Sequence, residues 1–196
     1  MKSKVKKAAF YMLAVIVGGC VPSLHPLFTE NELIFDSNLV GKWSQPNSPS
    51  YWEFKRAANN KYEVTYKDEK GLAKFEGMLG KIGSDTFLDL YPQDMNIPGN
   101  DFYKAHLIGG HTFLRVDMLD KGLYLTGMNP DSLDKLLKAD PNAVKAEKVR
   151  DRIVLTAPAK DLQAFVGKYS RDFQANIYGQ TDANNLLQKE QANSVK

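Results

Sequence analysis

The feature of this sequence that most constrains its fold is a series of short runs between residues 40 and 128 in which apolar and polar side chains alternate. The runs recur roughly every 8 to 12 residues, and turn-forming pairs such as Asn59-Asn60, Gly83-Ser84 and Gly109-Gly110 separate them. Alternation with a period of two is typical of strands that bury one face. The stretch therefore predicts an antiparallel β-meander.

We predict eight strands, at residues 40–44, 50–55, 61–67, 73–82, 85–91, 101–108, 111–118 and 122–128. Eight consecutive strands with one apolar face favour closure into a barrel. An open sheet would leave two edge strands whose unpaired backbone groups can pair with other chains. The predicted fold class is therefore all-β with minor α: an eight-stranded antiparallel meander barrel with one or two C-terminal helices.

Alternation also predicts which side chains point into the barrel. Eight of them are candidates to line a ligand cavity: Trp52, Phe54, Tyr62, Val64, Tyr66, Phe75, Leu114 and Val116. The other inward positions are Leu79, Leu88, Leu90, Tyr103, Ala105, Leu107, Leu123 and Leu125. An eight-stranded barrel can hold one small molecule, so the aromatic side chains either fill the interior as core or line a cavity for an apolar ligand.

Two helices and one further strand are predicted after the barrel. Asn129 can cap a helix that has a proline at its first position. Residues 152–156 predict a short strand, and residues 158–169 carry apolar side chains at helical spacing. The apolar stripe of this last helix needs a surface to cover. We expect the helix to pack on the outer face of the strands, where Phe102 and Phe113 are placed by alternation.

The single cysteine of the chain, Cys20, directly follows Val17-Gly18-Gly19. Four lysines within residues 1–7 precede an apolar run at 8–17, which is the pattern of a secretory signal. As a helix, residues 8–19 would span about 18 Å at roughly 1.5 Å per residue, well short of a bilayer core of about 30 Å. The pattern resembles the lipobox of bacterial lipoproteins, which implies lipidation of Cys20. An ordinary signal peptide with a cysteine nearby is the alternative.

This interpretation divides the chain into a signal peptide at 1–19, a lipidated N-terminus and spacer at 20–36, a barrel domain with its helix at 37–170, and a polar, flexible tail at 171–196. Removal of residues 1–19 takes away four lysines and no acids, so the formal net charge of +3 falls by four to −1. The mature chain therefore has no excess of positive charge with which to bind nucleic acid. Lipidation of the only thiol leaves no disulfide, so the hydrophobic core must stabilise the domain.

Residues 35–43 resemble the opening motif of the lipocalins, in which a Phe-Asp pair precedes Gly-x-Trp at the start of the first barrel strand. The pair here is Phe35-Asp36 and the second element is Gly41-Lys42-Trp43, with a spacing one residue shorter. The resemblance implies that the tryptophan closes the barrel floor and that a cation from the last strand covers it. Arg152 is the expected cation. The second lipocalin signature, Thr-Asp-Tyr, is not found at its expected turn.

The segments 22–43, 100–107, 128–137 and 151–166 are similar to a group of small bacterial lipoproteins of uncharacterised function. This resemblance implies the same fold and anchor, and it implies no function. In lipoproteins an aspartate after the lipidated cysteine signals retention at the inner membrane. Val21 stands at that position here, which implies anchorage to the outer membrane with the domain facing the periplasm.

The sequence contains no pattern that indicates catalysis or a cofactor. A two-residue turn at Gly109-Gly110 would place His106 and His111 on one face, where two zinc ligands could meet. Zinc needs at least a third protein ligand, and His25 lies in the predicted spacer. We interpret the hairpin histidines as solvated. The aspartates, Asp117 among them, fall at strand ends or on the predicted outer face, where solvated carboxylates are expected.

These inferences predict a non-enzymatic outer-membrane lipoprotein, exposed to the periplasm, that binds a small apolar or amphipathic ligand such as a fatty acid or lipid fragment. The membrane is its expected partner through Cys20, and no metal or other cofactor is expected. The alternative is an envelope interaction or assembly protein with a solid barrel. An open interior larger than one side chain favours the first function, and a filled interior with an exposed apolar patch favours the second.

Overall fold

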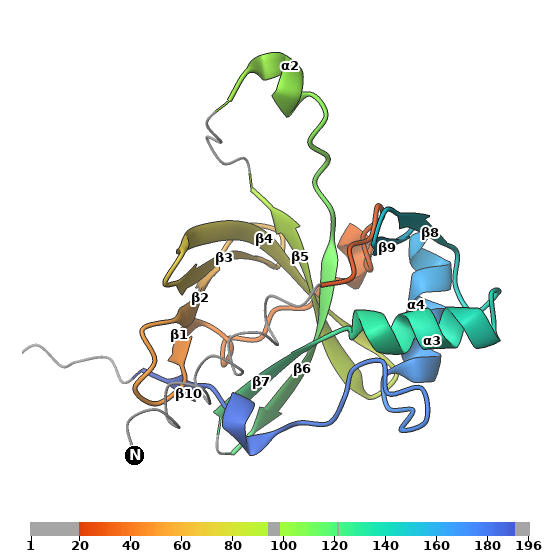
Figure 1. Cartoon of the computed structure of the whole chain (residues 1–196). Helices are drawn as coiled ribbons and strands as arrows, with labels where there is room; N and C mark the ends of the chain where they lie inside the picture. Colours follow the sequence, from red (N-terminus) through yellow and green to blue (C-terminus); the bar gives the residue numbers. More distant parts are fainter. Residues whose placement is uncertain (1–19, 94–98, 121, 191–196) are drawn as a thin grey trace, which may run out of the picture.

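The computed structural model describes residues 20–93, 99–120 and 122–190. Eight antiparallel strands form one sheet that curves into a nearly closed barrel (Figure 1). The predicted fold class is therefore confirmed. In sheet order the strands are β10 (Gln188–Lys189), β1 (Gly41–Ser44), β2 (Tyr51–Arg56), β3 (Lys61–Asp68), β4 (Gly71–Ile82), β5 (Asp85–Pro92), β6 (Thr112–Leu119) and β7 (Gly122–Gly127).

The barrel closes through a segment that the sequence analysis assigns to a flexible tail. Leu187 exchanges two backbone hydrogen bonds of 2.9 Å with Leu123 of β7. The next two residues form β10 and pair with β1. Ile177 and Tyr178 are also buried. The chain from 171 to 190 is therefore part of the fold, because backbone pairing and burial fix it despite its polar composition.

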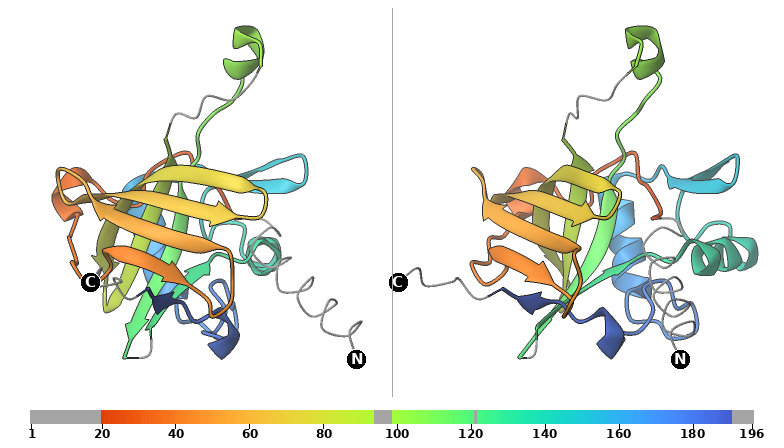
Figure 2. Two further views of the ribbon diagram at one scale, coloured as in Figure 1. Left: turned by 90° about the vertical axis from the view of Figure 1, so that its left-hand side faces the viewer. Right: turned by 60° about the vertical axis from the view of Figure 1, so that its left-hand side comes forward.

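The prediction of a strand at 101–108 is wrong. β5 pairs directly with β6, and the described residues 99–111 of the connection carry the short helix α2 (Asp101–Lys104) instead. The helix begins there because the Asn100 side chain accepts a hydrogen bond of 2.8 Å from the Phe102 N–H. Figures 1 and 2 show this connection projecting away from the barrel. The residues wrongly placed inside the barrel are Tyr103, Ala105 and Leu107.

Side chains fill most of the barrel interior. The buried residues of this first core are Leu39, Trp43, Phe54, Tyr62, Val64, Leu79, Leu88, Leu90, Leu114, Val116 and Leu123. Trp52, Phe75 and Leu125 are partly buried and pack against it. Alternation therefore predicted the inward positions of the six strands from β2 to β7, since a slip of one residue would turn each of these side chains outward.

A second core lies between the outer face of the sheet and the segments that cover it. The sheet contributes Met78, Phe87 and Phe113, and α4 (Ala159–Tyr169) contributes Leu162, Phe165, Val166 and Tyr169. The expected packing of this helix is thus confirmed at Phe113. It is wrong at Phe102, which is 79 % exposed on the projecting connection.

A further helix and a two-stranded sheet complete the covering layer. Helix α3 (Pro130–Ala139) begins as predicted, because the Asn129 side chain accepts a hydrogen bond of 3.0 Å from the Ser132 N–H. Strands β8 (Ala146–Val149) and β9 (Arg152–Leu155) form a separate two-stranded sheet. Short 3-10 turns, η1 (Glu30–Glu32) and η2 (Ala183–Asn185), precede β1 and β10.

Residues 20–36, which we call the strap, run across this outer layer and do not form a free spacer. The buried residues of the strap are Val21, Ser23, Leu27, Phe28 and Leu33. Ser23 forms a backbone bridge to His111 on one side and to β9 on the other. Gly80 of β4 makes room for the strap, because a Cβ atom at that position would lie 2.5 Å from the Phe28 ring. The strap is therefore part of the folded body.

Candidate functional site

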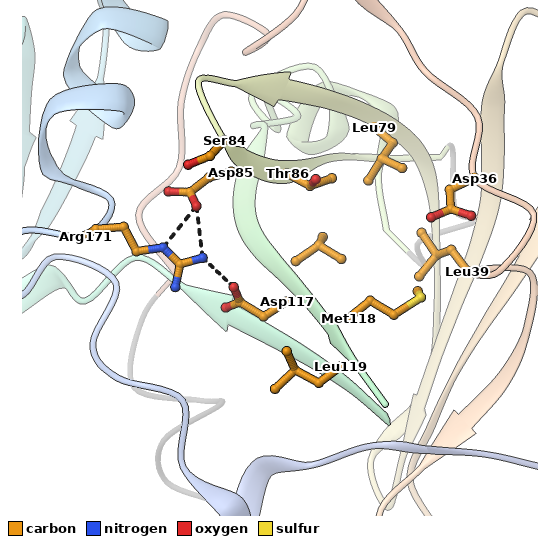
Figure 3. A pocket seen from close by; sticks show the side chains of 11 residues that line it. Asp36, Leu39, Leu79, Ser84, Asp85, Thr86, Asp117, Met118, Leu119 and Arg171 are labelled. Atoms are coloured by element: carbon orange, nitrogen blue, oxygen red, sulfur yellow. Dashed lines mark hydrogen bonds and ion pairs between the residues drawn. The ribbon is translucent and has the colours of Figure 1, made fainter. Parts of the chain in front are cut away.

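A pocket of about 250 Å³ lies at the end of the barrel where β4 turns into β5 and where β6 ends (Figure 3). Its walls come from the segment before β1, from the β4–β5 turn, from the end of β6 and from the chain after α4. The lining residues are Asp36, Leu39, Leu79, Ser84, Asp85, Thr86, Val116, Asp117, Met118, Leu119 and Arg171.

The floor of the pocket is apolar. Leu39, Leu79 and Val116 belong to the core of the barrel and form this floor. Leu119 stands at the opening and is 56 % exposed, so the pocket is accessible from solvent. The pocket is therefore a part of the barrel interior that side chains leave unfilled at one end.

The rim of the pocket is charged, and Arg171 joins two aspartates there (Figure 3). The Arg171 Nε donates to Asp85 Oδ1 at 3.0 Å, and its Nη2 pairs with both Asp85 and Asp117. The buried Arg115 donates from Nε to Asp117 Oδ2 at 2.9 Å and from Nη1 to the Ser170 carbonyl oxygen at 2.8 Å. Asp117 is therefore held between two guanidinium groups and is not the solvated carboxylate that we expected.

The hydrogen bonds of the rim keep Asp85 ionised. Burial of this carboxyl group favours its neutral form, but the hydrogen bonds from Arg171 and from the Ser170 hydroxyl outweigh burial and hold the pKa of Asp85 below its usual range. The same pairing raises the pKa of Arg171. The rim thus carries fixed charges at neutral pH. Sequence reasoning missed this cluster, because Arg171 lies in the segment that was assigned to the tail.

Of the eight residues predicted to line a cavity, Val116 alone lines this pocket. The others pack among themselves: Phe54, Tyr62, Val64 and Leu114 are buried, Trp52 and Phe75 pack against them, and Tyr66 lies against Trp52 with ring centroids 4.6 Å apart. The Tyr62 hydroxyl donates to the Asp36 carbonyl oxygen at 3.0 Å and accepts from the Asp36 N–H at 2.7 Å. Phe54 and Tyr62 are thus packed core, whereas Trp52, Tyr66 and Phe75 are only partly buried.

Trp43 belongs to the barrel core, and its cation partner differs from the expected one. Trp43 is buried and its Nε1 donates to the Leu39 carbonyl oxygen at 2.8 Å. The Lys189 Nζ lies 5.3 Å from the centroid of the Trp43 ring and also donates to the Asn38 carbonyl oxygen at 3.0 Å. Arg152, the expected partner, lies on β9 in the separate two-stranded sheet. The cation comes from β10 because that strand pairs with β1.

The histidines also lie elsewhere than expected. His106 is exposed on the projecting connection, whereas His111 is almost buried and its Nδ1 lies 2.9 Å from Asp89 Oδ1. The other Asp89 oxygen accepts the Leu27 N–H at 2.8 Å. Burial raises the pKa of Asp89, although its hydrogen bonds oppose this shift. His111 is therefore not solvated as expected, and its pair with Asp89 fastens the strap to the barrel.

Cys20 is exposed and directly precedes the buried Val21. The predicted signal peptide, residues 1–19, lies outside the described residues, as does the end of the predicted tail at 191–196. Within the described ranges, no group of three His, Cys, Asp or Glu side chains is placed to hold a metal ion. Nor does any helix in those ranges have the length and apolar character needed to cross a membrane.

Fold and site together define a small antiparallel β-barrel protein with a pocket at one end. No protein-family model matches the chain, and comparison with the curated proteins and with the solved structures finds no significant match.

Proposed function

We propose that this protein is a lipid-anchored, non-enzymatic protein of the cell envelope that binds a small amphipathic molecule in the end pocket of its barrel. The pocket itself carries the proposal, because its apolar floor and charged rim match a ligand with one apolar and one polar end. The lipobox pattern around Cys20 supports the anchor, with the outer membrane and its periplasmic face as the proposed location.

The volume of the pocket restricts the ligand. About 250 Å³ corresponds to roughly eight water molecules at about 30 Å³ each, slightly below the range of about 300–1,000 Å³ that is common for ligand sites. The buried core residues Leu39, Leu79 and Val116 bound the inner end of the pocket. A bound molecule is therefore short, or it is one end of a longer molecule that extends past Leu119 into solvent.

The charges of the lining favour a ligand head that donates hydrogen bonds. Three carboxylates, those of Asp36, Asp85 and Asp117, line the pocket together with one guanidinium group, that of Arg171. The guanidinium group is already paired with Asp85 and Asp117, and Arg115 pairs with Asp117 from behind, so one negative charge remains uncompensated. An anionic head would meet this surplus of negative charge, so we propose an amine or hydroxyl head in preference to the carboxylate of a fatty acid.

Ligand binding can be tested by native mass spectrometry of the protein purified from its own membrane. Thr86 faces the pocket, so Thr86→Phe should fill it, and Thr65→Phe on the outward face of β3 is the matched control. We expect a co-purifying small molecule on the wild type and on Thr65→Phe, and its loss from Thr86→Phe. Equal ligand on all three proteins would exclude the pocket.

The anchor has a separate test. We expect the N-terminal peptide of the membrane-bound protein to carry acyl groups on Cys20, and we expect Cys20→Ser to move the protein from the membrane fraction to the soluble periplasmic fraction. An unmodified thiol at this residue would contradict the anchor. This result would leave the pocket proposal standing, because the two features do not share residues.

The filled aromatic interior favours a second candidate function, that of an envelope interaction or assembly protein whose barrel serves as a scaffold. Crosslinking in intact cells distinguishes the two functions. A reproducible protein partner, together with the absence of any bound small molecule from the purified wild type, would favour the scaffold.

A further inference from the structure

The connection between β5 and β6 exposes large apolar side chains to a degree that the barrel does not. Phe102, Tyr103, Leu107 and Ile108 are 79 %, 64 %, 46 % and 82 % exposed. Phe102 and Tyr103 lie in α2, which stands at the projecting end of the connection (Figure 1, Figure 2), and Leu107 and Ile108 follow it. We call residues 99–110 the apolar loop. Such clustering marks an interaction surface, whereas single exposed apolar residues need no explanation.

The base of the apolar loop is fixed to the body. His111 exchanges two backbone hydrogen bonds of 2.8 Å with Ser23 of the strap. The Tyr91 ring lies against the His111 imidazole at a tilt of 39°, with centroids 4.7 Å apart, and Gly109 lies so close that a Cβ atom there would be 2.8 Å from the Tyr91 hydroxyl oxygen. These contacts fix the position of the loop base on the body.

The same place holds the residue that we propose as the lipid anchor. A Cβ atom on Gly110 would lie 3.2 Å from the Pro22 Cβ, so the loop base touches the strap two residues after Cys20. Because a chain spans at most about 3.6 Å per residue, Cys20 lies within about 11 Å of Ser23. Val21 is buried, so no free linker separates the anchor from the body. Acyl chains on Cys20 would bring the bilayer surface close to the base of the apolar loop.

We propose that the apolar loop is a second membrane contact, which inserts its aromatic and aliphatic side chains into the lipid surface to which Cys20 anchors the protein. This inference rests on the proposed anchor. Lys104 lies among these side chains and can extend its amine to the lipid headgroups while its methylene stem stays in the apolar layer. A protein partner is a poorer match, because a standard interface needs about 800 Å² on each side and this tip consists of a four-residue helix with its flanks.

Spin labelling of the anchored protein tests the proposal. In the acylated protein Cys20 has no free thiol, so a nitroxide attached to Ile108→Cys reports on the loop alone. The matched control is Phe173→Cys, which is 78 % exposed on the chain after α4. In the native membrane we expect the ratio of oxygen to nickel-chelate accessibility to be several-fold higher at Ile108→Cys than at Phe173→Cys.

Each alternative result has a defined meaning. Equal accessibility ratios at the two positions on protein whose Cys20 is acylated would overturn the loop proposal and leave the anchor intact. An immobilised label at Ile108→Cys without gain in oxygen accessibility would also overturn it, in favour of a protein partner. If mass analysis finds Cys20 unmodified, the anchor fails and the membrane contact fails with it.

Discussion

At the scale of single residues, Asp89 connects three parts of this protein. Its carboxylate is fully buried on the outer face of β5, and it accepts hydrogen bonds from His111 at the loop base and from Leu27 in the strap. Burial of a carboxylate without hydrogen-bond partners is strongly destabilising. Asp89 can therefore be buried only because it accepts these two hydrogen bonds. The residue therefore couples the strap, the sheet and the apolar loop.

We expect Asp89→Ala to lower the free energy of unfolding by about 2–5 kcal/mol, because the Leu27 N–H and the His111 ring nitrogen both lose a buried partner. Urea denaturation monitored by tryptophan fluorescence measures this. Asp101→Ala, at a fully exposed side chain, is the control and should change stability by less than about 0.5 kcal/mol. A small effect at both positions would show that the strap is not fastened through Asp89.

The free energy of unfolding should also depend on pH through the ionisation of Asp85. Because the pKa of Asp85 is lower in the folded protein than in the unfolded chain, its pairing stabilises the fold above about pH 4 and this contribution is lost as the pH falls through the folded pKa. We therefore expect Asp85→Asn to be less stable than the wild type at pH 7, with a difference that shrinks towards pH 3. Urea denaturation at both pH values measures the two differences. A difference that grows in acid would contradict the sign of the pKa shift.

At the scale of elements, sequence alternation predicted the seven strands from β1 to β7, and the inward faces of β2 to β7, because each of these strands buries one row of side chains in the barrel. It could not predict β10, since a two-residue strand has no period to detect and pairs through its backbone. The apolar loop was predicted to be a strand because its apolar and polar side chains alternate. It contains a helix instead, because the Asn100 side chain caps one there. The strap was missed because its contacts are irregular.

The closure by β10 gives a prediction for two glycines that share a backbone conformation. Gly122 and Gly71 have φ angles of +147° and +153°, which residues with a Cβ atom rarely adopt. A Cβ on Gly122 would lie 2.2 Å from the Leu187 carbonyl oxygen, whereas a Cβ on Gly71 would meet nothing within 4 Å. We expect Gly71→Ala to cost about 1–3 kcal/mol from backbone strain alone, and Gly122→Ala to cost clearly more. Thermal denaturation compares them, and equal costs would show that residue 187 does not close the barrel.

At the scale of the whole molecule, the protein has two cores that share one sheet, and residues 20–36 and 171–190 are integral to them. This arrangement explains why the candidate site could be predicted only in part. Its floor comes from strands whose pattern is regular, as at Val116, whereas its charged rim needs Arg171 to approach β5 and β6 from a distant segment. Such long-range pairing leaves no local signal in the sequence.

Limited proteolysis tests this description of the whole molecule. Chymotrypsin should cut the native protein first in the apolar loop, at Phe102 or Tyr103, because these side chains are exposed and project from the body. Phe28 in the strap should be protected until the protein unfolds, since it is buried against Gly80. Mass spectrometry of the first fragments identifies the sites. Early cleavage in the strap would show that it is a free spacer after all.

The position of β10 in the sequence sets the order of events during biosynthesis. As the chain emerges from its N-terminus into the compartment where it folds, β1 and β7 become available before residues 187–189, which join them. During that interval both edges are open to pairing with any extended chain. A nascent or truncated polypeptide is therefore exposed to self-association until these residues arrive, and chaperone dependence should be concentrated in that window.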